Sequence, residues 1–73
     1  MNHDTEFDAG EMACGELVVE LRKILRRLRP GQILKLRALD PGAPVDLPAY
    51  CRLTRNPLVE SKPPFFWIER KRD

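Results

Sequence analysis

The chain has 73 residues, so we expect one small domain covering residues 1–73, with residues 1–4 forming a disordered tail. Hydrophobic residues make up 42% and charged residues 33%, a balance typical of a globular protein. No apolar run approaches the about 20 residues that cross a bilayer, and the acidic N-terminus shows no signal peptide. These features exclude a membrane span and a multidomain enzyme, and they favour a cytoplasmic protein.

Charge is unevenly distributed along the chain, although the formal net charge is only +2. The residues that precede Cys14 include several aspartates and glutamates but neither lysine nor arginine. The basic excess is concentrated at residues 22–29 and 70–72. Such basic surfaces often do no more than keep a small protein soluble, but they can also meet an acidic partner or RNA.

The hydrophobic pattern predicts six elements in chain order. Residues 5–9 form a weak strand candidate, and residues 15–29 predict a helix whose leucines and isoleucine form one apolar stripe, ended by Pro30-Gly31. Residues 32–40 alternate between apolar and other side chains, as in a half-buried strand. Residues 44–54 predict a shorter helix with two prolines in or near its first turn. Residues 58–62 and 65–71 predict an antiparallel hairpin.

The order β-α-β-α-β-β predicts a two-layer α/β sandwich of the α+β type. Its four-stranded mixed sheet would have both helices on one face, because a strand–helix–strand unit favours a parallel pair and the hairpin adds antiparallel strands. Phe66 and Ile68 would then face the helices. Four side chains are expected on the open face of the sheet: Lys35, Arg37, Phe65 and Trp67.

Two cysteines and one histidine limit the chemistry. Cys14, Cys51 and His3 are too few and too irregularly spaced for a structural zinc site, so neither a metal nor another cofactor is expected. In a reducing cytosol both thiols would be free. Cys51 lies on the apolar stripe of the second predicted helix, which indicates a buried position. For Cys14, the residues alone leave open a reactive thiol or an inert loop thiol.

Two stretches of the sequence contain distinctive motifs. DPGA followed by DLPAYCR, at residues 40–52, resembles the DPG…DIPAFCR stretch of the TusA/SirA family of small sulfur-carrier proteins. Residues 8–17 align without gaps with that family's DLRGLxCPxP signature, which places Cys14 on the signature cysteine. The chain departs from the family where Cys-Pro-x-Pro is replaced by CGEL at residues 14–17, and where the usual GH becomes Arg55-Asn56.

The resemblance implies the family's fold and a persulfide carrier that acts through Cys14. Such a carrier accepts sulfane sulfur from a cysteine desulfurase or a rhodanese-like donor and passes it to an acceptor protein, toward tRNA thiolation or sulfur metabolism. The predicted place of Cys14 at the start of a helix favours a thiolate, so we expect a lowered pKa. Glu16, and with it Glu11 and Asp8, would oppose that shift.

The docking surfaces for donor and acceptor are expected among the acidic residues around the cysteine and on the basic first helix. Asp40 and Asp46 on their own are interpreted as a turn-forming residue and an acid near a helix start. Five residues are the candidates for partner binding: Glu16, Arg22, Arg26, Asp40 and Asp46.

Two alternatives stay open beside the sulfur carrier. A degenerate family member could serve as a binding or regulatory module without sulfur transfer, which the loss of both motif prolines suggests. RNA binding through the open face of the sheet is the other, since cations and aromatic rings alternate there. Direct nucleic-acid binding is not expected, and nothing in the sequence requires more than a monomer.

Overall fold

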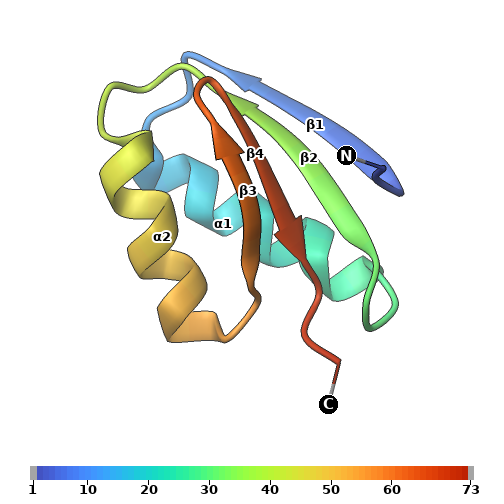
Figure 1. The fold of residues 1–73 in the computed structure, drawn as a ribbon. Coiled ribbons are helices and arrows are strands. Elements are labelled where there is room, and N and C mark those ends of the chain that lie inside the picture. The colour runs from blue at the N-terminus through green and yellow to red at the C-terminus, as the bar shows by residue number, and fades with distance from the viewer. Residues whose placement is uncertain (1, 73) are drawn as a thin grey trace.

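The computed structural model describes residues 2–72, and its elements follow the predicted order β-α-β-α-β-β (Figure 1). All six predicted elements are present, and none of their ends differs from the predicted one by more than two residues. The elements are β1 (Thr5–Gly10), α1 (Cys14–Arg27), β2 (Ile33–Ala38), α2 (Ala43–Thr54), β3 (Leu58–Lys62) and β4 (Phe65–Glu69).

The strands form one mixed sheet in the order β1-β2-β4-β3. β1 pairs in parallel with β2, whereas β4 is antiparallel to both β2 and β3. Because β1 and β2 are parallel, the residues that follow these two strands leave the sheet at the same edge. This edge is where both helices begin (Figure 1). The predicted α/β sandwich is confirmed.

The core lies between one face of the sheet and the two helices. Leu17, Leu21 and Leu25 recur every four residues along α1 and are almost completely buried. The helices and the sheet contribute to a single hydrophobic cluster, so both helices pack on the same face. The buried side chains from the other elements include Leu34, Leu36, Leu47, Cys51, Phe66 and Ile68.

The opposite face of the sheet carries the predicted mixture of cations and aromatic rings. The β2–β4 register places Lys35 opposite Trp67, and Arg37 opposite Phe65. The Nζ atom of Lys35 lies 4.8 Å from the centre of the Phe65 ring and 5.7 Å from that of Trp67. The lysine therefore covers these rings from within the same sheet.

The segment before β1 is attached to the sheet at Asp4. The backbone N–H of Asp4 donates to the carbonyl of Ile33 (2.8 Å), and the backbone N–H of Ile33 donates to Oδ2 of Asp4 (2.8 Å). Asp4, assigned from the sequence to a terminal tail, thus extends the contact between β1 and β2. Within residues 2–72, neither helix has the length and apolar character needed to cross a membrane.

α2 ends in a left-handed residue that is not glycine. Arg55 has φ 65° and ψ 17°, a conformation in which the Cβ atom of an L-residue is crowded. This conformation turns the chain toward β3 and places the side chain of Asn56 in the interior, where its Oδ1 accepts from the backbone N–H of Lys71 (2.9 Å). In the family motif that this segment resembles, glycine stands where this chain has Arg55.

Replacing Arg55 with glycine should stabilise the fold. We expect Arg55→Gly to raise the free energy of unfolding by about 0.5–1 kcal/mol, because glycine adopts the left-handed conformation without crowding. Arg52→Gly is the matched control within α2, where glycine should cost about 1 kcal/mol. Urea denaturation of the three proteins measures both effects, and equal destabilisation by the two substitutions would contradict this account of the helix end.

Candidate functional site

Cys14 is the first residue of α1, whereas the sequence predicted it one position earlier relative to the helix, at the cap. It follows Ala13, the N-cap residue, whose side chain makes no capping hydrogen bond. The first N–H groups of a helix have no partner within the helix. Here the backbone N–H of Cys14 donates to Oδ2 of Asp40 at 2.9 Å, so a residue from the β2–α2 loop takes over the capping role. The thiol-bearing residue is thereby tied to the second half of the chain.

The same loop brings two carboxylates to the start of α1. Oδ1 of Asp40 accepts from the backbone N–H of Gly42 (3.0 Å), which is the N-cap residue of α2. A Cβ atom at Gly42 would lie 3.0 Å from Oδ2 of Asp46 and 3.7 Å from Oδ1 of Asp40. The glycine therefore leaves room for both aspartates to approach the same point. Both lie within reach of the Cys14 thiol, which has a single proton to donate.

This environment keeps the partly exposed Cys14 thiol protonated. Desolvation is the largest effect, and together with the hydrogen bonds to Asp40 and Asp46 it raises the pKa of Cys14 from 9.0 to about 12. The charges of the two carboxylates act in the same direction. Conversely, the backbone N–H of Gly42, followed by the Cys14 thiol and N–H, lowers the pKa of Asp40.

The prediction that the helix start lowers the pKa of Cys14 is therefore wrong. The backbone N–H of Cys14 is occupied by Asp40, and desolvation together with two carboxylates outweighs the favourable end of the helix dipole. The acids named from the sequence as opponents of the thiolate are also not the ones that act. Asp8, for example, pairs with Arg37 at 2.9 Å instead.

The two replaced motif prolines have different surroundings. Gly15 has open space where a Cβ atom would lie, so this position imposes no packing constraint. Leu17, by contrast, is fully buried in the core. The leucine therefore contributes to the packing of α1, and its loss would expose or empty a part of the core.

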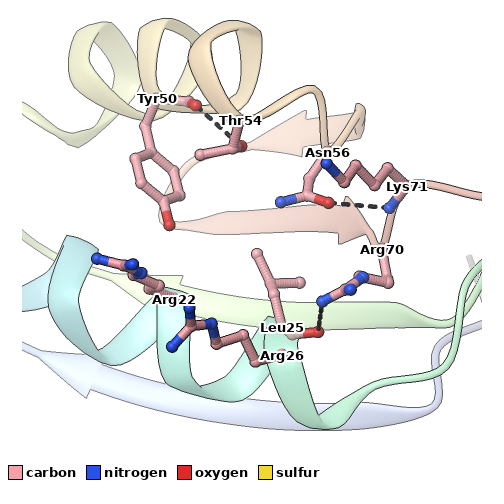
Figure 2. Close-up of a pocket in the computed structure, with 8 residues that line it drawn as sticks. All are labelled: Arg22, Leu25, Arg26, Tyr50, Thr54, Asn56, Arg70 and Lys71. Atoms are coloured by element: carbon pink, nitrogen blue, oxygen red, sulfur yellow. Dashed lines mark hydrogen bonds between the residues drawn. The ribbon is translucent and has the colours of Figure 1, made fainter. Parts of the chain in front are cut away.

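The candidate partner-binding residues divide into two places on the surface. Asp40 and Asp46 lie beside Cys14, and Glu16 is exposed in the first turn of α1. Arg22 and Arg26 are exposed farther along the helix, where they line a cleft of about 430 Å³ between α1 and α2 (Figure 2). The structure thus brings the two aspartates to the thiol but leaves the arginines on a separate surface.

Cys51 has the buried position predicted from the sequence. It is only 4% exposed, and burial raises its pKa to about 11. Both cysteines are free thiols. Cys14 is the more accessible of the two, because it is partly exposed whereas Cys51 is buried. Across residues 2–72, no three His, Cys, Asp or Glu side chains are grouped so that they could hold a metal ion.

The parallel pairing of β1 and β2 explains a neighbourhood that we did not derive from the sequence. Cys14 follows β1, and Asp40 follows β2, so parallel strands bring both residues to one edge of the sheet. The strand–helix–strand pattern together with the DPG turn would have been enough to predict that Cys14 and Asp40 lie close together. The cleft had no comparable signal, because its walls come from both helices and from the segment after β4.

Residues 5–68 match the family model described as Sulfurtransferase TusA. The chain belongs to the TusA family. Sulfur carrier protein TusA of Pseudomonas entomophila (strain L48) is 35% identical over 75 residues, which cover 97% of this chain and 94% of that protein. The protein of the same name from Allochromatium vinosum is 37% identical over 59 residues, or 81% of this chain and 78% of its own length. The resemblance inferred from the motifs is confirmed.

Removing one of the two carboxylates should make Cys14 easier to ionise. We expect Asp46→Asn to lower the pKa of the thiol and to shift iodoacetamide alkylation of Cys14 to lower pH, by about three- to tenfold in rate at a given pH. Peptide mass spectrometry after timed alkylation distinguishes Cys14 from Cys51. Glu16→Gln is the control, since this exposed acid does not contribute to the shift. An unchanged profile in Asp46→Asn would contradict the assignment.

Proposed function

We propose that this protein is a sulfur carrier that accepts sulfane sulfur as a persulfide on Cys14 and passes it to an acceptor protein. Membership of the TusA family supports the carrier function. The observation that supports Cys14 as the carrying residue is its place: it is partly exposed at the start of α1, on the family's signature position, while Cys51 is buried.

The transfer needs no cofactor, because sulfur moves between thiols without a net change of electrons. In the loading step, the sulfur of Cys14 attacks the outer sulfur of a donor persulfide. A new S–S bond forms on Cys14, the donor's S–S bond breaks, and the donor cysteine leaves as a thiolate that takes up the proton lost by Cys14. In the unloading step an acceptor thiolate attacks the outer sulfur and becomes the new persulfide, the S–S bond to Cys14 breaks, and Cys14 leaves as a thiolate that takes up the proton given up by the acceptor thiol.

Asp40 and Asp46 determine when the first step can occur. Their hydrogen bonds to the thiol favour the protonated form, which does not attack a persulfide. A partner that presents lysine or arginine to these two carboxylates would weaken their effect on the pKa and would ease proton loss. The thiol of the free carrier would thus be protonated and unreactive, and docking of a partner would make this thiol reactive.

The proposed docking surface extends from the thiol along α1. Asp40 and Asp46 place negative charge beside the thiol, and Glu16 is an exposed acid in the first turn of α1. Arg22 and Arg26 add positive charge two and three turns farther on. A cysteine desulfurase or a rhodanese-like protein would be the donor, and the acceptor would lead toward tRNA thiolation or sulfur metabolism. The free thiols suit a monomer that works in the reducing cytoplasm.

The open face of the sheet gives no support to the alternative of RNA binding. Lys35 lies over the rings of Phe65 and Trp67, and Arg37 pairs with Asp8. These contacts use the cations and the ring faces that a single strand of RNA would need. Cross-strand packing is therefore sufficient to explain the composition of this face.

Persulfide formation on Cys14 can be measured directly. We expect incubation with a cysteine desulfurase and cysteine, or with a rhodanese and thiosulfate, to add one sulfur atom to the intact protein. The adduct should disappear in Cys14→Ser and persist in Cys51→Ser, because only the former removes the accessible thiol. Intact-mass and peptide mass spectrometry read both outcomes. An adduct that forms on Cys51, or none with either donor, would refute the proposal.

A further inference from the structure

A cleft of about 430 Å³ lies on the helical side of the molecule, between α1, the end of α2 and the segment that follows β4. It lies away from the thiol, since Arg22 is eight residues after Cys14 and therefore about 12 Å farther along α1. Leu25 closes its base (Figure 2). Its other lining residues are Arg22, Arg26, Tyr50, Thr54, Asn56, Arg70 and Lys71.

Positive charge converges on this cleft from two sides. Arg22 and Arg26 are one helical turn apart on α1, and Arg70 and Lys71 face them from the chain after β4. None of the residues that line the cleft is acidic. Within residues 2–72, these four cations form no ion pair, whereas Lys23, Arg37 and Arg72 each have an acidic partner.

Asn56 adds an oriented hydrogen-bond donor to the cleft. Its side chain is 8% exposed, and its Oδ1 is held by the backbone N–H of Lys71. This contact orients the amide nitrogen into the cleft, where it makes no hydrogen bond with residues 2–72 (Figure 2). The amide nitrogen is therefore available to donate to a ligand or to water in the cleft.

Arg70 and Tyr50 also line the same space, and Arg70 is held in place. Nη1 of Arg70 donates to the carbonyl of Leu25 at 2.8 Å, which fixes the guanidinium against the end of α1, while its buried Nε has no partner. The hydroxyl of Tyr50 points from α2 toward α1 (Figure 2). The cleft therefore offers several oriented donors and few free acceptors, which is the arrangement that an oxoanion needs.

We propose that this cleft binds a ligand that carries two adjacent phosphate groups. The guanidinium group of arginine can donate two parallel hydrogen bonds to the oxygens of one phosphate. Two phosphates provide enough negative charge and acceptor oxygens for the four cations and the Asn56 amide. A single carboxylate has one charge and two oxygens, so it would leave most of these donors unused. The volume lies within the range of about 300–1,000 Å³ that is common for small-ligand sites. The cleft is separate from the Cys14 thiol, although Arg22 and Arg26 also belong to the proposed docking surface.

Calorimetric titration of the full chain with pyrophosphate tests the proposal. We expect saturable binding with one site, and a shift of the Asn56 side-chain amide signals in nitrogen–proton NMR spectra. The double variant Arg22→Gln with Arg26→Gln should bind at least about tenfold more weakly, because it removes two charge-assisted contacts. Cys14→Ser should bind as the unchanged protein does, so failure here and failure of the carrier function can be told apart.

A matched control removes the same charge from α1 outside the cleft. Lys23→Gln with Arg27→Gln alters two exposed positions that do not line it, and it should leave binding within about threefold of the original. ADP and a short single-stranded RNA then show whether the phosphates belong to a free nucleotide or to a nucleic acid. The absence of pyrophosphate binding, an equal loss in both double variants, or binding of only a glutamate-rich peptide would each overturn the proposal.

Discussion

The carboxylate of Asp40 accepts hydrogen bonds from two backbone N–H groups that are far apart in the sequence, those of Cys14 and Gly42. One oxygen therefore caps α1 and the other orders the turn that begins α2. Both helices start at the same edge of the sheet because β1 and β2 are parallel. Asp40 can therefore accept hydrogen bonds at both helix starts. The place of the thiol follows from this bridge: Cys14 cannot move without breaking the cap of its own helix.

The bridge has a chemical cost for a nucleophile. It places carboxylates beside the sulfur, so the position that best presents Cys14 to a partner also disfavours its thiolate. Because oxidation and alkylation proceed through the thiolate, a protonated thiol is also protected while the carrier is free. Reactivity then depends on what docks against Asp40 and Asp46. In a protein whose task is to accept sulfur from one partner and release it to another, such dependence on docking favours specific transfer.

The fold could be predicted almost completely, because its signals are local. The leucine stripe predicted α1, and the alternation of side chains predicted β2. Prolines and glycines marked where elements end, and the order of the elements predicted the layers. The pKa of Cys14 could not be predicted in the same way. A helix start alone implies a lowered value, whereas the raised pKa follows from desolvation and from carboxylates of the β2–α2 segment, of which Asp40 lies 26 positions away in the sequence. The cleft was missed for the same reason, since its donors come from three separate segments.

α1 thus connects two chemically different surfaces, a thiol among carboxylates at its start and a group of cations farther along. The thiol surface depends on the hydrogen bond between the Asp40 carboxylate and the backbone N–H of Cys14. An NMR pH titration measures this contact directly. We predict that the side-chain carboxyl of Asp40 titrates below 3.8 and that the amide proton of Cys14 shifts with the same midpoint. A midpoint at or above 3.8, with a Cys14 amide that does not respond, would contradict the account.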